Sequence, residues 1–306
     1  MKTQILEPDE FPALALDKLR ALGPVVVGPT EDTTDVEAVF TRLATVLDAA
    51  FHARYPALRT IVSPTTGLDH IDLDYFGSRG IDVVSLRGRT AFLDNIHATA
   101  EHTIALALAL IRDIPAAVAA VREGRWNRYP HKGNELHGKT VLIHGYGRIG
   151  RLVAPIYRAF GCTVLAHDVV EGRVPEGFRC DFAEALAETD ILSIHLPLNV
   201  ETRGLLDADL LSRLPPRAIV VNTSRGEVVD QDHLLAALEQ GKLAGAALDV
   251  LIGEPDPVSS ALKTRFAALG KRLVITPHIG GFTYESLDAV EEFITGAFID
   301  SIRDRG

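Results

Sequence analysis

The chain has 306 residues, and its 41 acidic against 31 basic side chains give a formal net charge of −10 at pH 7. This length predicts two domains, and the acidic balance argues against nucleic acid or an anionic membrane surface as a partner. The two cysteines, Cys162 and Cys180, are too few for a disulfide framework and lack the spacing of metal ligands. No apolar run reaches the roughly 20 residues that a membrane helix needs. We therefore expect a cytoplasmic protein with no secretory signal, no bound metal and no membrane partner.

Short apolar runs alternate with helical patterns through the first third of the chain. The runs are VVVG (25–28), AVFTRL (38–43), RTIVSP (59–64) and DVVSL (82–86). This is the βαβ pattern of a parallel sheet, and it predicts a smaller sheet of four or five strands. The following segment, Asn95 to Trp126, is rich in Ala and Leu and predicts mostly helix. Pro115 is expected to kink or divide this helix, because an interior proline loses a hydrogen bond and clashes with the preceding turn.

Six further runs predict one open sheet in the second half of the chain. They are KTVLIHG (139–145), TVLAHD (163–168), DILSIHLP (190–197), AIVVNTS (218–224), GAALDV (245–250) and LVITPH (273–278). The segment 284–306 predicts a terminal helix that can cross back to the first domain. The predicted fold class is α/β, with two doubly wound parallel-sheet domains, the larger of Rossmann type, and an interdomain cleft. The predicted boundaries are 1–95 plus 285–306 for a substrate-binding domain and 96–284 for an NAD-binding domain.

Three closely spaced glycines follow the first strand of this second sheet, in VLIHGYGRIG (141–150). Gly145 permits a tight turn, Gly147 lets the backbone approach a pyrophosphate, and Gly150 allows close packing of the helix whose amino terminus faces the phosphates. Asp168, at the end of the next strand, is placed to bind both ribose hydroxyls and would repel a 2′-phosphate, so NAD is predicted in preference to NADP. A helix cap or a solvated Asp168 is the less favoured alternative.

Polar side chains also follow three later strands, at the edge where open α/β sheets hold their ligands. Arg225 is a candidate carboxylate clamp, because a guanidinium grips a carboxylate through two parallel hydrogen bonds. His278 can exchange the proton of a hydroxyl near neutral pH, and Glu254 can stabilise its charged form. Each of the three also has an ordinary reading as a loop or surface residue. His144 is interpreted as a satisfied packing histidine, with a charged role near the pyrophosphate as the alternative, and the remaining histidines as structural or solvated.

The segments NTSRGEVVD, ALDVLIGEP and TPHIGG, which carry Arg225, Glu254 and His278, resemble the D-2-hydroxyacid dehydrogenase family, which includes phosphoglycerate dehydrogenase. The segments SPTTGLDHID (63–72), ATAEHTIALALAL (98–110), ELHGKTVLIHGYGRIG (135–150) and HLPLNVETRGLL (195–206) are similar to further family segments and stand in the family's order. The resemblance covers nearly the whole chain.

This resemblance implies an oxidoreductase that transfers a hydride between NAD(H) and C2 of a small D-2-hydroxy acid or 2-keto acid. Arg225 would orient the substrate carboxylate, His278 would be the acid/base, and Glu254 would be its partner. Cofactor contacts are implied at Gly145, Gly147, Arg148, Ile149, Gly150, Asp168, Thr223 and Asp249, the last to the nicotinamide amide. Substrate contacts are implied at the backbone N–H groups of Thr65, Thr66 and Gly67, with Arg42 as a candidate for a second anionic group.

The resemblance also implies a homodimer that forms through the helical segment 98–123, and we expect no carboxyl-terminal regulatory domain. Two other hypotheses stay open beside the dehydrogenase. One is an NAD-sensing co-repressor-like binding protein, and the other is a dehydrogenase of a different donor such as phosphite. Within the leading hypothesis, the identity of the 2-hydroxy acid, its phosphorylation, the direction and the pathway are left open.

Overall fold

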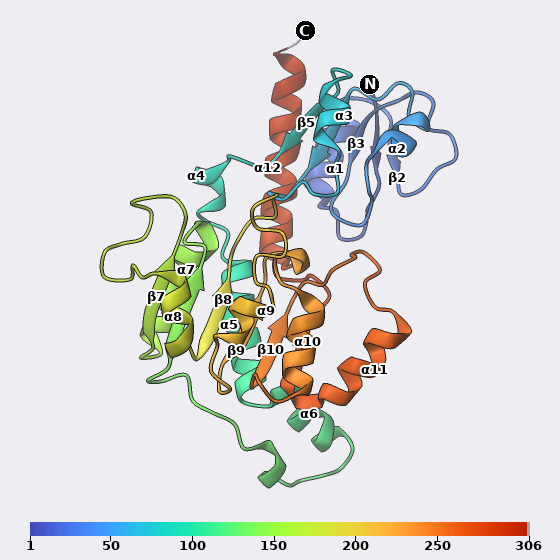
Figure 1. Ribbon diagram of the computed structural model, residues 1–306. Coiled ribbons are helices and arrows are strands. Elements are labelled where there is room, and N and C mark those ends of the chain that lie inside the picture. Colours follow the sequence, from blue (N-terminus) through green and yellow to red (C-terminus); the bar gives the residue numbers. More distant parts are fainter. Residues whose placement is uncertain (305–306) are drawn as a thin grey trace. The chain divides into compact units, whose positions relative to one another are not determined.

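A computed structural model describes residues 1–304, which form two compact units (Figure 1). The smaller unit comprises Met1–Ile96 together with the segment from Phe282 onward, and the larger unit comprises His97–Gly281. The first boundary follows residue 96 where the sequence suggested 95, and the second follows residue 281 where it suggested 284. The smaller unit is therefore built from both ends of the chain.

The smaller unit contains a parallel sheet of five strands in the order β2-β1-β3-β4-β5. Its strands are β1 (Lys2–Ile5), β2 (Val25–Val27), β3 (Val36–Phe40), β4 (Thr60–Ser63) and β5 (Asp82–Ser85). Its helices are α1 (Ala13–Arg20), α2 (Ala49–Ala53), α3 (Leu73–Gly77), α4 (Thr90–Leu93) and α12 (Tyr284–Arg303). Val39 and Phe40 belong to different apolar clusters, because successive strand residues point to opposite faces of the sheet. The terminal helix α12 packs against α1, β4 and β5, so the expected return to the first domain is confirmed.

The larger unit contains a parallel sheet of six strands in the order β11-β10-β9-β8-β6-β7. Its strands are β6 (Thr140–His144), β7 (Thr163–His167), β8 (Ile191–Ile194), β9 (Ile219–Asn222), β10 (Gly245–Leu248) and β11 (Leu273–Ile275). Its helices are α5 (Ala98–Ile111), α6 (Ile114–Arg122), α7 (Arg148–Ala159), α8 (Phe182–Ala185), α9 (Ala208–Ser212), α10 (Gln231–Glu239) and α11 (Ser260–Leu269). Single 3-10 turns lie at Tyr129–His131, Leu186–Glu188, Gly226–Val228 and Gly270–Arg272. The two parallel sheets confirm the predicted α/β class.

The long helical segment is divided, as the proline predicted. α5 ends at Ile111, Asp113 adopts a left-handed conformation with φ 54°, and Pro115 lies in the first turn of α6. Proline is tolerated there because the first turn of a helix has no intrahelical N–H bond to lose. No single helix in the described part of the chain is long and apolar enough to cross a membrane. The pair α5 and α6 together has the length and apolar composition of a membrane span, but the chain bends by 65° between the two helices. Most of the apolar residues of α5 are buried, as in a core helix.

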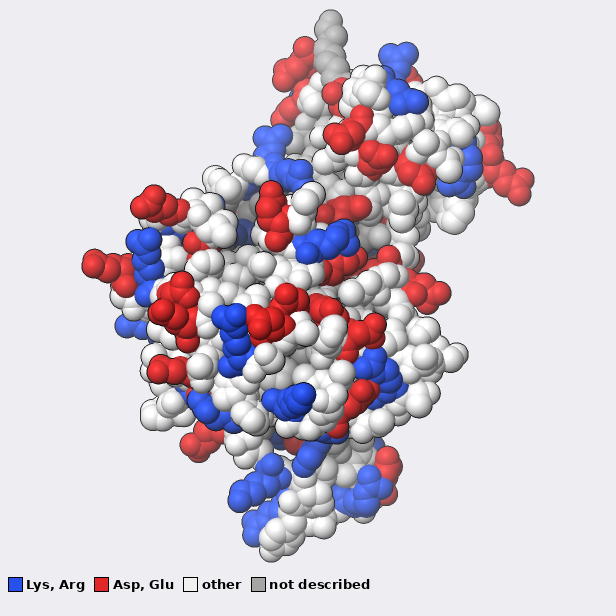
Figure 2. Space-filling model, in the orientation of Figure 1, with Lys and Arg blue, Asp and Glu red and all other residues white. Residues whose placement is uncertain are grey.

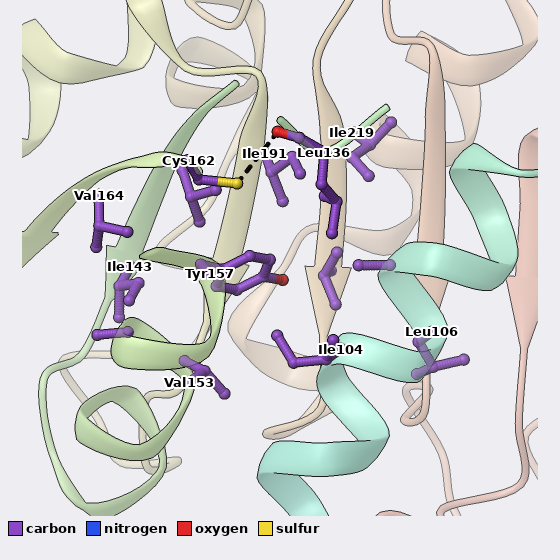
Figure 3. Packing of buried hydrophobic residues seen from close by; sticks show 14 of the residues in the cluster. Ile104, Leu106, Leu136, Ile143, Val153, Tyr157, Cys162, Val164, Ile191 and Ile219 are labelled. Carbon is purple, nitrogen blue, oxygen red and sulfur yellow. Dashed lines mark hydrogen bonds between the residues drawn. The ribbon is translucent and has the colours of Figure 1, made fainter. Parts of the chain in front are cut away.

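The core of the larger unit packs α7 and α5 against the sheet (Figure 3). The fully buried ring of Tyr157, from α7, lies among Ile104, Ile143 and Ile191 in this cluster. Cys162 is buried beside it and its thiol donates to the carbonyl of Leu136 over 3.2 Å. Both cysteines are free, and burial raises the pKa of each thiol. On the visible surface, acidic and basic side chains are interspersed (Figure 2).

Candidate active site

The three glycines form a tight turn between β6 and α7. Gly145 has φ 94°, and a Cβ at this position would lie 2.6 Å from the carbonyl oxygen of His195. A Cβ on Gly150 would lie 2.2 Å from the carbonyl oxygen of Gly145, so the helix can approach the strand only with glycine here. Gly147 differs from the other two glycines, because no described atom lies within 4 Å of the position that a Cβ would occupy. Open space therefore lies above the first turn of α7, whose N–H groups at Arg148 and Ile149 fit a pyrophosphate.

Asp168, which follows β7, holds the glycine turn through hydrogen bonds. Its carboxylate is almost buried, with 5% of the side chain exposed, and accepts from the N–H groups of Tyr146 over 2.9 Å and Val170 over 2.8 Å. Arg173 contacts both carboxylate oxygens, at 3.0 and 3.1 Å. A pocket of about 440 Å³, lined by residues between 166 and 181, adjoins this carboxylate. The position fits the ribose of a dinucleotide, and its hydroxyls would compete with Arg173 for the carboxylate.

His144 is a packing histidine, but its ring is stacked rather than hydrogen-bonded. The ring lies 3.8 Å from that of Phe182 at 14°, and neither ring nitrogen has a hydrogen-bond partner among the described residues. Burial, and then the neighbouring His167, lower the pKa of His144 from 6.5 to about 3. The ring is therefore neutral at pH 7. The expectation of a hydrogen-bonded ring is wrong. The lowered pKa argues against the alternative of a charged ring beside the pyrophosphate.

His278 and Glu254 are brought together in the larger unit. The Nδ1 atom of His278 lies 2.5 Å from Oε2 of Glu254, and the other carboxylate oxygen accepts from the N–H of Leu251 over 3.0 Å. His278 has φ 54°, a left-handed conformation that is uncommon for residues other than glycine, and its N–H donates to the carbonyl of Asp249 over 2.8 Å. Because an ionised carboxylate only accepts, the Nδ1 atom carries the proton. The Nε2 atom is left for a substrate.

Arg225 lies in a turn after β9 that Asn222 holds in shape. The Oδ1 atom of Asn222 accepts from both the N–H and the hydroxyl of Ser224, at 3.0 and 2.7 Å, and its Nδ2 atom donates to the carbonyl of Arg225 over 2.9 Å. A Cβ on Gly226 would lie 2.2 Å from the carbonyl carbon of Leu251. The turn that carries Arg225 is therefore in backbone contact with the loop that carries Glu254. The Nη1 atom of Arg225 donates to the carbonyl of Ser224 over 2.7 Å.

Asp249 holds the loop of His278. Its carboxylate is 1% exposed and accepts from the Thr276 hydroxyl over 2.6 Å and from the N–H groups of Ile279 and Gly280 over 2.9 and 2.7 Å. The Nε2 atom of His102, on α5, lies 3.2 Å from the same carboxylate. Burial alone would raise the pKa of Asp249, but the hydrogen bonds from His102, Thr276 and the two backbone groups outweigh it, and the pKa lies below its usual value. The implied contact to the nicotinamide amide stays a prediction.

The amino-terminal half of α5 supports the site, which the sequence did not indicate. The sequence predicts a structural or solvated His102, and in the structure it contacts both Asp249 and the Thr276 hydroxyl, the latter at 3.0 Å. The hydroxyl of the neighbouring Thr103 lies 2.8 Å from that of Thr223, a predicted cofactor contact. The signal in the sequence is the family-like segment ATAEHTIALALAL, which contains both residues.

In the smaller unit, the predicted substrate turn lies after β4. The hydroxyl of Thr65 donates to the carbonyl of Gly67 over 2.8 Å and lies 2.8 Å from the hydroxyl of Ser63, so the turn that includes Thr66 has a fixed shape. Arg42, after β3, is already engaged. Its Nε atom donates over 2.7 Å to Glu291 of α12, whose side chain is 1% exposed. Burial raises the pKa of Glu291, while the charge of Arg42 opposes this shift.

The family of the chain follows from a family-model match. Residues 104–280 match the NAD binding domain of the D-isomer specific 2-hydroxyacid dehydrogenases. The chain belongs to this family. The matched segment contains the glycine loop, Asp168, Arg225, Glu254 and His278, so the larger unit is the family's NAD-binding domain and its cofactor is NAD(H).

Relatives within the family differ in the reactions that their names give. The chain is 38% identical over 289 residues to a D-3-phosphoglycerate dehydrogenase of Mycobacterium bovis, covering 90% of this chain and 53% of the relative. It thus spans about half the length of such curated relatives. It is 36% identical to a glyoxylate reductase of Thermofilum pendens, covering 84% of this chain and 76% of the relative. A D-lactate dehydrogenase of Aquifex aeolicus, solved with NAD and lactic acid, superposes with a TM-score of 0.84 at 26% identity, covering 99% of this chain and 96% of that one.

Proposed function

We propose that this protein is an NAD(H)-dependent dehydrogenase that interconverts a small D-2-hydroxy acid and the corresponding 2-keto acid. The observation that carries the proposal is the 2.5 Å contact between His278 and Glu254, next to the turn of Arg225 and in the same unit as the glycine loop. An acid/base, its partner and a guanidinium are the groups that this reaction requires. The matching family model supports the same reaction class.

NAD(H), when bound, supplies or accepts the hydride at C2 of the substrate. Arg225 binds the substrate carboxylate through two parallel hydrogen bonds and so fixes the orientation of C2. The Nε2 atom of His278 gives a proton to the C2 oxygen during reduction and takes it during oxidation. Glu254 accepts from Nδ1, which fixes the tautomer and stabilises the protonated ring. We further propose that the backbone N–H groups of the turn 65–67 bind the substrate carboxylate.

The cofactor is held by groups that the larger unit presents in fixed positions. The N–H groups at the start of α7 bind the pyrophosphate above Gly147. Asp168 binds the ribose hydroxyls, and its negative charge disfavours a 2′-phosphate, so we propose NAD rather than NADP as the preferred form. Asp249 binds the nicotinamide amide as well as holding the loop of His278.

The test is the oxidation of NADH with a panel of 2-keto acids, for the wild type and for His278→Gln. We expect turnover with at least one keto acid and a loss of at least about 10²-fold in kcat for the variant, because general acid–base catalysis contributes about 10²- to 10⁴-fold. NADH binding, followed by nicotinamide fluorescence, should be unchanged in the variant. Near-normal turnover by His278→Gln would refute the assignment. Saturable NADH binding without turnover by the wild type would favour the co-repressor hypothesis.

Homodimer formation and a cytoplasmic location are part of the same proposal. α6 exposes Ile114, Val118 and Val121, at 46%, 42% and 52%, and their spacing of four and three residues places them on one helix face. Trp126 and Tyr129, which follow α6 in the chain, are also exposed, at 91% and 80%. Such a surface supports a protein partner, and a second copy of the chain is the partner that we propose. The two free thiols support a reducing compartment.

A further inference from the structure

We propose that Arg87 and Arg89 form a second anion-binding site in the smaller unit, which binds an anionic group at the far end of the substrate. This inference rests on the proposed function, because it concerns the other end of the same 2-hydroxy acid. It assigns a substrate class: a 2-hydroxy or 2-keto acid with an additional carboxylate or phosphate.

The two arginines lie beside the turn that is predicted to bind the C1 carboxylate. β4 and β5 are neighbouring parallel strands with Ser63 opposite Ser85, so the segments that follow them leave the sheet at the same edge. The N–H of Leu86 donates to the carbonyl of Thr65 over 3.2 Å. The segment that carries the arginines is therefore hydrogen-bonded directly to the predicted substrate turn, at the edge where α/β sheets bind ligands.

The backbone of this segment is fixed. The N–H of Arg89 donates to the carbonyl of Leu86 over 3.0 Å, and Gly88 between the arginines has φ 81°, which gives a tight turn that favours glycine at its third position. Leu86 and Leu93, on either side, are buried, and the ring of Phe92 stacks on Phe293 of α12 at 3.9 Å. Both arginines therefore extend from a rigid base, which reduces the entropy lost when they bind an anion.

The two arginines are also the exception among the arginines of this unit. In residues 1–96 and 282–304, every other arginine has an ion pair or lies over an aromatic ring: Arg20 with Asp17, Arg42 with Glu291, Arg54 over Phe51, Arg59 with Glu37, Arg79 over Tyr75 and Arg303 with Asp300. Arg87 and Arg89 are exposed, and within those same ranges neither side chain has an ion pair or a ring contact. Two uncompensated cations within three residues, in a chain of net charge −10, favour an anionic ligand.

Arg42, the candidate that the sequence offers for this role, already has partners in the structure. Its guanidinium is paired with the buried carboxylate of Glu291 and donates to the carbonyl of Asp9 over 2.7 Å. Freeing it would leave Glu291 buried without a counter-charge, which is costly. Arg87 and Arg89 carry no such partner, so we assign the second anion to them.

The test compares three kinds of 2-keto acid in the NADH assay: 2-oxobutyrate with a neutral tail, 2-oxoglutarate with a carboxylate tail, and 3-phosphohydroxypyruvate with a phosphate tail. The variants are Arg87→Gln, Arg89→Gln and the double variant. Arg79→Gln, at an exposed arginine of the same unit, is the matched control. We expect the wild type to prefer one of the two anionic tails, and whichever it prefers identifies the group.

The double variant should lower kcat/KM for the preferred acid by about 100-fold, since each charged hydrogen bond contributes about 10-fold or more, and should leave 2-oxobutyrate unchanged. NADH binding should be unchanged, which shows that the variant is folded. A wild type that prefers the neutral tail would overturn the inference while leaving the dehydrogenase intact, as would equal losses for all three acids or no loss. A wild type that reduces no 2-keto acid would refute the proposed function itself.

Discussion

Replacing His144 by phenylalanine should make folding less sensitive to acid. The pKa of His144 is lowered from 6.5 to about 3 in the folded protein, chiefly by burial. Below pH 6.5 the unfolded chain therefore binds a proton that the folded chain does not, and stability falls as the pH drops towards 3. Each pH unit in this window is worth about 1.4 kcal/mol, so at pH 5 the loss from this one side chain is about 2 kcal/mol. Phenylalanine has no proton to bind, and its ring can keep the stacking on Phe182.

The measurement is the free energy of unfolding in urea at pH 7 and at pH 5, followed by far-ultraviolet circular dichroism. This probe is preferable to fluorescence because Trp126, the single tryptophan, is 91% exposed. The difference between the two pH values should be smaller by about 2 kcal/mol in His144→Phe than in the wild type. His97→Gln, at an exposed histidine, is the control and should keep the wild-type difference. The same acid loss in His144→Phe as in the wild type would refute the reasoning.

Three further predictions concern the larger unit. Arg225→Lys should lower kcat/KM by about 10²- to 10³-fold, which corresponds to about 2–4 kcal/mol of transition-state stabilisation, because lysine cannot bind a carboxylate through two parallel hydrogen bonds. Full activity of this variant would show that another residue binds the carboxylate. Asp168→Ala should weaken the preference for NAD over NADP, and Arg173→Ala should strengthen this preference because it leaves the Asp168 carboxylate uncompensated. The preference is measured as the ratio of kcat/KM for NAD to kcat/KM for NADP. An unchanged ratio in these variants would contradict the role of Asp168. His102→Ala should lower kcat by about 10-fold or more while the KM for NADH stays constant, and His102→Gln, which keeps a donor for Asp249, should recover most of the loss. Equal effects of the two replacements would show that His102 only packs.

The sheets were predictable from the sequence because fully buried parallel strands are nearly continuous apolar runs. Ile143, Ile191 and Val220 lie in runs of this kind and form strands as expected. β1 was not among the runs identified, because Thr3 and Gln4 are polar although both are buried, the latter donating its side-chain N–H to the carbonyl of Gly28 over 2.9 Å. A buried hydrogen bond to the residue that follows β2 leaves no periodic signal in the sequence.

The parts of the candidate site that were predictable lie in short segments that each follow a strand. The glycine turn after β6 and the meeting of His278 with Glu254 are of this kind. The contact of His102 with Asp249 joins residues 147 positions apart, and that of Arg42 with Glu291 joins residues 249 positions apart. Composition and spacing along the chain say nothing about which distant charges meet. The sequence therefore identified Arg42 as a cation without indicating that a buried carboxylate already compensates it.

The pairing of Arg42 with Glu291 has a consequence for the order in which the chain can fold during its synthesis. The larger unit, His97–Gly281, is one continuous segment, so it can fold before the residues that follow it are synthesised. The smaller unit is incomplete until α12 is made, because Ile294 and Phe298 fill its apolar cluster and Glu291 neutralises Arg42. Residues 1–96 thus wait with an uncovered apolar face, and with Arg42 lacking its counter-ion, while residues 97–281 are synthesised. During this interval the nascent chain is most exposed to aggregation and most in need of a chaperone.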